Sequence, residues 1–138
     1  MKRMKPGFSF LPHTADMRMR VAGRTLKGLF ENAAKGLSEL LTGKHGPGRE
    51  SILKIRIKAV DPETLLVSWL NELNYRCIEK HASIERTAIS EITPHSVDAE
   101  IMLRTGAKIN REIKAFTYHK LAINRTKNGY KTEIVFDI

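Results

Sequence analysis

The stretch TLKGLFENAAKGLSELLTG, residues 25–43, decides much of the fold. Its apolar residues recur every three or four positions, the pattern of a helix lying on a hydrophobic core. They are Leu26, Leu29, Phe30, Ala33, Ala34, Leu37, Leu40 and Leu41. Thr25 is a suitable N-cap, and Gly43 suits the left-handed residue that ends a helix. Gly28 and Gly36 each cost up to about 1 kcal/mol relative to alanine in a helix interior, and a close approach to a sheet would explain them.

A second helix is predicted to start at Asp61-Pro62-Glu63, because these residues suit an N-cap, a first-turn proline and a first-turn acid. Its apolar stripe consists of Leu65, Leu66, Trp69, Leu70, Leu73 and Cys77. We expect it to end between residues 79 and 81. Cys77 lies on the stripe, which predicts a buried small side chain rather than a reactive thiol.

Alternation of apolar and polar residues predicts strands over most of the remaining chain. The expected strands are 8–11 (or an extended lead-in), 17–23, 51–59, 84–92, 97–103, a strand from Thr117 with His119, Leu121 and Ile123 on one face, and 130–138. Residues 112–125 fit neither period cleanly. Asn128-Gly129 predicts a hairpin turn before the closing strand.

This order of elements predicts an α+β fold, in which a mixed sheet carries both amphipathic helices on one face in two layers. The 138 residues correspond to a single domain, 1–138, large enough for a hydrophobic core. We find no internal repeat and no linker.

Charge and composition limit the function classes. The chain has 24 Lys and Arg against 15 Asp and Glu, a formal net charge of +9. That excess favours either contact with a polyanion such as RNA or simple solubility. The single Cys77 fits a reducing compartment. No apolar run is long enough to span a bilayer and no signal peptide is evident, so we expect a cytoplasmic protein without a membrane partner.

Motifs of common enzyme classes are missing from the sequence: it has no phosphate-binding glycine loop, nucleophile elbow, Cys-x-x-Cys or His-Glu-x-x-His. Three acidic groups remain as candidates, namely Asp16, Asp137 and the C-terminal carboxylate of Ile138. Each has an ordinary explanation as a turn or strand-end acid. If the closing strand runs beside the strand at 17–23, however, they would form part of an oxygen site for a hard cation such as Ca²⁺.

A basic face is a further candidate. Arg18, Arg20, Lys54, Arg56 and Lys58 would contact phosphates together if their strands are neighbours. A charged sheet edge in solvent is an equally good explanation. Lys114 and His119 flank Thr117-Tyr118, where a surface lysine and a half-buried aromatic are the simpler interpretation.

Several runs resemble the archease family. They are His13-Thr14-Ala15-Asp16, Gly23–Leu26, Leu29–Leu37, Leu65-Leu66, Trp69–Leu73, Glu112–His119 and the terminal Asp137-Ile138. They occur in the family's order and extend over nearly the whole chain. The sequence departs from the family pattern at Arg18, at Phe116 and in the polar run at 74–77, and none of these departures touches the three acidic groups.

The resemblance implies a protein cofactor rather than an independent enzyme. Archeases activate the RtcB-type RNA ligase of tRNA splicing by promoting its guanylylation and multiple turnover, and chaperone-like modulation of a tRNA methyltransferase is also associated with the family. The family's metal site, usually described with calcium, corresponds here to Asp16, Asp137 and Ile138. Lys114 lies in a matching run and is assigned a role in ligase activation.

Two other classes compete with this interpretation. A module that acts mainly on tRNA would bind RNA with strong salt dependence when no ligase is present. A metal-dependent hydrolase would turn over substrate alone, and the sequence offers it no evident base or nucleophile.

Overall fold

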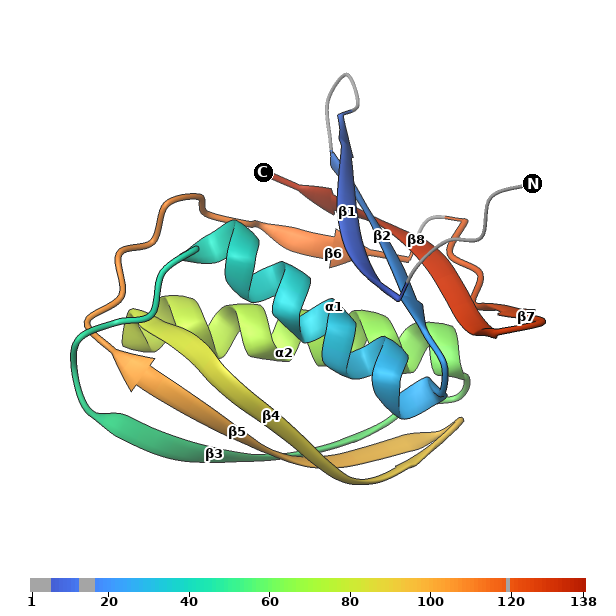
Figure 1. Cartoon of the computed structure of the whole chain (residues 1–138), viewed down its shortest axis with the longest axis horizontal. Coiled ribbons are helices and arrows are strands. Elements are labelled where there is room, and N and C mark those ends of the chain that lie inside the picture. Colours follow the sequence, from blue (N-terminus) through green and yellow to red (C-terminus); the bar gives the residue numbers. More distant parts are fainter. Residues whose placement is uncertain (1–5, 13–16, 119) are drawn as a thin grey trace.

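The computed structural model describes residues 6–12, 17–118 and 120–138, and its elements are shown in Figure 1. In chain order they are β1 (Gly7–Pro12), β2 (Met17–Gly23), α1 (Leu26–Leu41), β3 (Glu50–Lys58), α2 (Pro62–Lys80), β4 (Ala82–Thr93), β5 (Ser96–Thr105), β6 (Ala115–Thr117), β7 (Asn124–Thr126) and β8 (Gly129–Asp137). The predicted α+β class and both predicted helices are confirmed.

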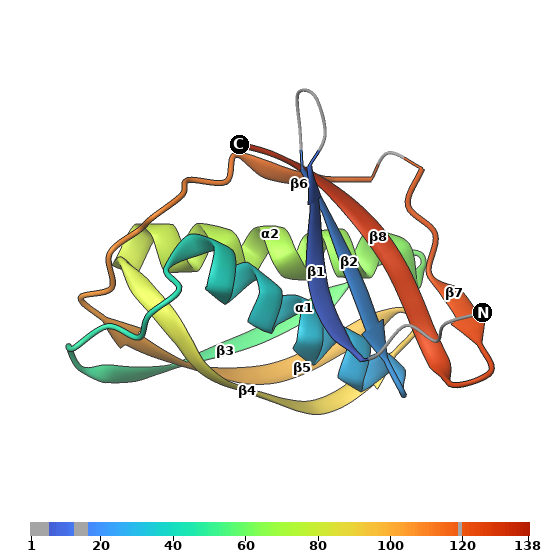
Figure 2. The same ribbon diagram turned by 45° about the horizontal axis from the view of Figure 1, so that its top comes forward.

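The strands form two sheets, which differs from the single mixed sheet expected above. One has the order β1-β2-β8-β6, with β7 also paired to β8, and the other has the order β3-β5-β4. All described strand pairs are antiparallel. The helices lie between the two sheets in both views (Figures 1 and 2). Alternation identifies a strand but not its partners, so the division into two sheets was not visible in the sequence.

Helix α1 lies close against the sheet of β1 and β2. Thr25 caps it as predicted, since its hydroxyl accepts the Gly28 N–H at 2.9 Å. Gly43, with φ +67°, follows its C-terminal end. A Cβ on Gly36 would lie 2.4 Å from Sδ of the buried Met19. The predicted close approach is therefore confirmed at Gly36, whereas a Cβ on Gly28 would come no closer than 3.3 Å to its nearest neighbour.

Helix α2 packs against α1 through its one tryptophan. Trp69 is fully buried, and its indole N–H donates to the backbone oxygen of Phe30 at 3.0 Å. At its start, the Asp61 carboxylate accepts the Thr64 N–H at 2.7 Å. Cys77 is buried as predicted, and burial raises the pKa of its thiol to about 12. That shift keeps the thiol protonated and unreactive.

The prediction of a strand running on from Thr117 is wrong. Strand β6 ends at Thr117, and the chain turns where the Leu121 N–H donates to the Tyr118 carbonyl at 3.1 Å. Lys120 in this turn has φ +53°. The Ile123 N–H then bonds to the Glu63 carboxylate of α2 at 3.0 Å instead of to a strand. The predicted residue His119 lies outside the described residues.

Candidate functional site

The first feature of the candidate site is the pairing of β2 with β8, which the sequence analysis required for a shared acidic site. Met17, the first residue of β2, lies opposite Phe136. Asp137 directly follows Phe136, and Asp16 directly precedes Met17 in the sequence. The register therefore confirms that the closing strand runs beside the strand at 17–23. Asp16 itself lies outside the described residues.

Two of the three predicted metal ligands lie at the end of β8. The Asp137 side chain is exposed, and Ile138, which carries the terminal carboxylate, is 44% exposed. Within the described ranges, Asp137 makes no ion pair, and these ranges contain no group of three acidic, histidine or cysteine side chains that would hold a metal. Adjacent free carboxylates are the oxygen donors that Ca²⁺ and Mg²⁺ prefer. The donors fit a hard cation, which would need further oxygens from other groups.

The backbone of Lys114 lies beside the end of β8. Its backbone N–H donates to the Asp137 backbone oxygen at 2.9 Å, and the next residue, Ala115, lies opposite Asp137 in the β6–β8 pair. The Lys114 side chain is exposed. The structure thus brings the backbone of Lys114, the residue just before β6, next to that of Asp137 at the end of β8, although the two are far apart in sequence.

Two asparagines of α2 hold the backbone on either side of Lys114, and the sequence analysis did not identify them. The Asn71 side chain donates to the Phe116 oxygen at 3.1 Å and accepts the Phe116 N–H at 2.8 Å. Asn74, which is 5% exposed, donates to the Ile113 oxygen at 2.9 Å. An asparagine on the apolar stripe of a helix is the sequence signal that would have indicated them, because a buried amide requires partners.

The predicted common basic face does not exist. Arg18 and Arg20 belong to one sheet, whereas Lys54, Arg56 and Lys58 lie on β3 of the other. Arg18 and Arg20 also share the carboxylate of Glu133, at 3.6 and 3.1 Å. These five cations therefore do not form one phosphate-contacting surface. Among the described helices, none is long and apolar enough to cross a bilayer.

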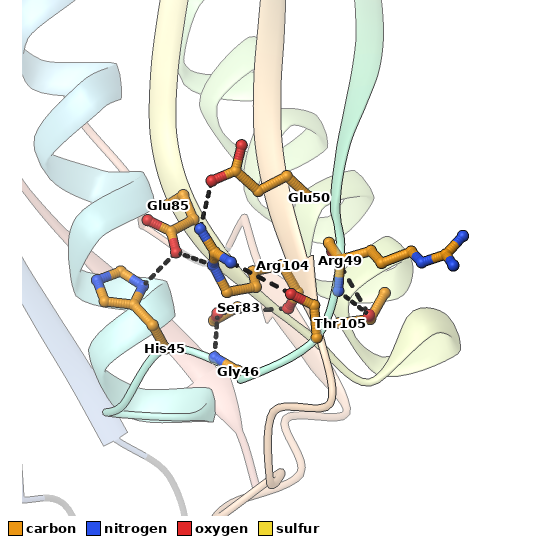
Figure 3. A network of polar contacts seen from close by, with 9 residues as sticks. His45, Gly46, Arg49, Glu50, Ser83, Glu85, Arg104 and Thr105 are labelled. Atoms are coloured by element: carbon orange, nitrogen blue, oxygen red, sulfur yellow. Dashed lines mark hydrogen bonds and ion pairs between the residues drawn. The ribbon is translucent and has the colours of Figure 1, made fainter.

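A polar network that includes three ionisable side chains around Arg104 lies at one end of the second sheet (Figure 3). Arg104 of β5 contacts the carboxylates of Glu85 and Glu50, and His45 Nδ1 lies 3.7 Å from Glu85. Glu85 is the extra residue at a register shift in β4, and such bulges redirect side chains. The hydrogen bond from Arg104, and then the charge of His45, lower the pKa of Glu85.

The same network fastens the loop before β3. The Gly46 N–H donates to the Ser83 hydroxyl at 2.9 Å, and the Gly48 N–H donates to the Thr105 oxygen at 2.8 Å. A Cβ on Gly46 would lie 2.2 Å from the Thr105 oxygen. Because its charges are paired and its donors face the backbone, the network stabilises the loop.

Known proteins resemble this chain over nearly its whole length. The model of the Archease protein family matches residues 8–138. Protein archease of Methanosarcina barkeri is 30% identical over 139 residues, covering 95% of each chain. Protein archease of Archaeoglobus fulgidus is 32% identical over 135 residues, covering 95% of this chain and 98% of that one.

Two solved structures also resemble this chain over nearly its whole length. The crystal structure of an archease from Thermotoga maritima, described as a possible chaperone, superposes with a TM-score of 0.70 at 26% identity and covers 100% of this chain and 99% of that one. The solution structure of protein 1598 of Methanobacterium thermoautotrophicum gives a TM-score of 0.69 at 25% identity, covering 96% of this chain and 99% of that one. This chain belongs to the archease family.

Proposed function

We propose that this protein is a cofactor of an RtcB-type RNA ligase in the cytoplasm, and that it promotes guanylylation of the ligase and its multiple turnover in tRNA splicing. The proposal includes a divalent cation, with calcium as the first candidate, held by Asp16, Asp137 and the carboxylate of Ile138. Lys114 is the residue assigned to ligase activation. On this proposal the protein itself is not an enzyme.

Beyond family membership, one structural observation supports the proposal that this chain activates a ligase. The backbone of Lys114, just before β6, is bonded to that of Asp137, so that Lys114 and the exposed residues 137 and 138 lie together at the end of β8 that is beside the start of β2. A bound divalent cation would supply positive charge to phosphate oxygens. The chain's own part is to present the carboxylates on an exposed strand end and to hold Lys114 beside them through a backbone hydrogen bond.

The test is a time course of ligase guanylylation with GTP, with and without this protein, across divalent cations. We expect wild-type protein to accelerate guanylylation and Asp16→Ala to lose the acceleration while its circular dichroism spectrum is unchanged. Direct calcium binding, measured by calorimetry without ligase, gives a second readout. If Asp16→Ala stimulates guanylylation as well as the wild type, the acidic site has no part in activation.

A tRNA-binding or chaperone-like modulator of a tRNA methyltransferase is the second candidate. The net charge of +9 favours it, and the Thermotoga maritima relative is described as a possible chaperone. This function predicts salt-dependent tRNA binding by the protein alone, with a steep slope in a filter-binding titration. A flat slope would argue against direct tRNA binding and leave the ligase proposal intact.

A further inference from the structure

Strand β3 has a long open edge. Within the part of the chain that the structure describes, it is paired on one side only, because the sheet order is β3-β5-β4. Its nine residues stay in register with β5 from Glu50 opposite Arg104 to Lys58 opposite Ser96, with no shift. The other edge strand of this sheet, β4, has two register shifts. Bulges of that kind protect an edge from pairing; β3 has no bulge, and its edge carries the charges of Lys54, Arg56 and Lys58, which disfavour pairing with another basic strand but not with an acidic one.

The backbone of β3 presents unpaired groups to this edge. At its two ends, the Thr105 N–H donates to the Arg49 oxygen at 3.0 Å, and the Ala59 N–H donates to the His95 oxygen at 2.9 Å. In an antiparallel pair, hydrogen-bonded and non-hydrogen-bonded positions alternate. The odd-numbered residues from 49 to 59 therefore bond to β5, and the N–H and C=O of the even-numbered residues point to the open edge.

The side chains of β3 are suited to a neighbour on that edge. On the outer face, Ile52 is 60% exposed, and the exposed row continues with Lys54, Arg56 and Lys58. On the inner face, Leu53 is only half-buried, whereas its partner Ile101 on β5 is fully buried. A strand added beside β3 would cover apolar surface on both faces and would meet three cations on the outer one.

We propose that this edge of β3 binds an extended segment of a partner protein, whose outward residues are acidic and whose inward residues are apolar, as an added strand. Backbone hydrogen bonds would supply the affinity and the alternating side chains the selectivity. The proposal concerns a surface in the second sheet and is independent of the ligase and metal proposals.

Charge decides between the possible occupants. A second copy of this chain, paired through its own β3, would bring two rows of lysine and arginine together, which is unfavourable. RNA would leave the open N–H and C=O groups of the edge without strand partners. Arg56 already bonds to Asp98 at 2.7 Å, whereas Lys54 and Lys58 make no ion pair among the described residues. An acidic strand satisfies both the open backbone groups and these two lysines.

The probe is a capped synthetic peptide of about eight alternating glutamate and valine residues, a usual strand length. It is added to full-length protein labelled with ¹⁵N, and amide hydrogen exchange is measured by NMR. We expect saturable binding, with exchange slowed at least threefold at Lys54 and Arg56, whose N–H groups face the edge. A peptide with lysine in place of glutamate, and one methylated on alternate backbone nitrogens, should not bind.

Two pairs of variants separate backbone from charge. Lys54→Pro removes one open N–H together with the Lys54 charge, without touching the bonds to β5, whereas Lys54→Ala removes the charge alone. Loss of one hydrogen bond should make the proline variant bind the peptide roughly two- to tenfold more weakly than the alanine variant. Lys58→Glu should weaken peptide binding roughly two- to fivefold, as for an exposed ion pair, and Lys35→Glu on α1 should leave it unchanged.

The proposal is supported if the glutamate peptide slows exchange while the lysine peptide and the methylated peptide do not. This result stands even if Lys54→Pro misfolds, because both peptide controls use unaltered protein. No saturable binding, equal binding of the lysine peptide, or slowed exchange that arises from self-association without peptide would overturn it.

Discussion

Asn71 and Phe116 form a two-way amide contact between α2 and β6. The Asn71 side chain donates to the Phe116 oxygen at 3.1 Å and accepts the Phe116 N–H at 2.8 Å. Strand β6 has only three residues, so this contact replaces the support that a longer strand would have. It also fixes the backbone two residues from Lys114, and so links the packing of α2 to the candidate site.

Asn71→Ala should lower the free energy of unfolding by about 1–3 kcal/mol, because the partly buried Phe116 amide group loses both partners. Amide exchange at Phe116 should accelerate as well. Urea denaturation and NMR exchange measure the two effects. Ser68→Ala on the same helix is the matched control and should stay within about 0.5 kcal/mol of wild type. Equal stability of the two variants would mean that water replaces the asparagine without loss.

The two glycines of α1 should respond oppositely to alanine. Gly36→Ala places a methyl group against Met19 and Phe8, at 2.4 and 3.0 Å before any adjustment, and such overpacking typically costs about 1–3 kcal/mol. In Gly28→Ala the new Cβ would lie 3.3 Å from the Thr25 hydroxyl oxygen, a tight contact that a small shift of this side chain relieves, so helix propensity should leave a gain below about 1 kcal/mol. Thermal unfolding of both proteins measures the contrast. A stabilised Gly36→Ala variant would show that the sheet moves away at little cost.

The elements with strong periodicity were predictable from sequence, because the interactions that start and end them join residues close together in the chain. Thr25 and Asp61 cap their helices through side chains that reach only three residues along the chain. The predicted hairpin turn is present but one residue earlier than expected, because Thr126 pairs with Gly129 and the turn residues are Lys127 and Asn128. The pairing of β2 with β8 was predicted only as a condition, since no local signal encodes a contact between Met17 and Phe136.

Structure after Thr117 was not predictable for the opposite reason. The alternation of Leu121 and Ile123 resembles a strand, yet the chain is held there by Glu63 of α2, a tertiary contact with no sequence signature. The basic face failed for a similar reason, because alternation on β2 and β3 gives no information on whether they share a sheet. The three candidate ligands were named from their residue types and strengthened by the family resemblance, while Asn71 and Asn74 had to be found from their hydrogen bonds.

Stability should depend on pH through Glu85. The hydrogen bond from Arg104 lowers the pKa of Glu85 in the folded protein. Ionised Glu85 therefore stabilises the fold at pH values above its pKa in the unfolded chain, about 4.3, and this stabilisation is lost as the pH falls through the lower pKa of the folded state. Glu85→Gln should therefore destabilise the protein at pH 7, with a difference that disappears in acid. Urea unfolding from pH 7 down to about pH 3 covers this range. Glu91→Gln, an exposed carboxylate on the same strand, is the control and should show a much smaller dependence.

Metal binding should depend on Asp137 and on the chain end. Asp137→Asn should weaken calcium binding at least about tenfold, because the site loses one of its few charged ligands. A C-terminal extension that moves the terminal carboxylate away from Ile138 should weaken calcium binding as well. Calorimetry measures the affinity, and the calcium-induced rise in melting temperature checks it. Glu133→Gln is the matched control, since that carboxylate on the same strand is occupied by Arg18 and Arg20.

Substitutions at Lys114 test ligase activation separately from folding stability and calcium binding. Its N–H holds the Asp137 carbonyl, whereas its side chain is exposed. Lys114→Ala keeps the backbone bond and should leave stability and calcium affinity unchanged, while stimulation of ligase guanylylation falls. Lys108→Ala, another exposed lysine before β6, should retain full stimulation. If Lys114→Ala stimulates like the wild type, the side chain has no role and the activating contact must come from the carboxylates. Partial recovery in Lys114→Arg would indicate that positive charge at this position, rather than a lysine-specific contact, acts on the partner.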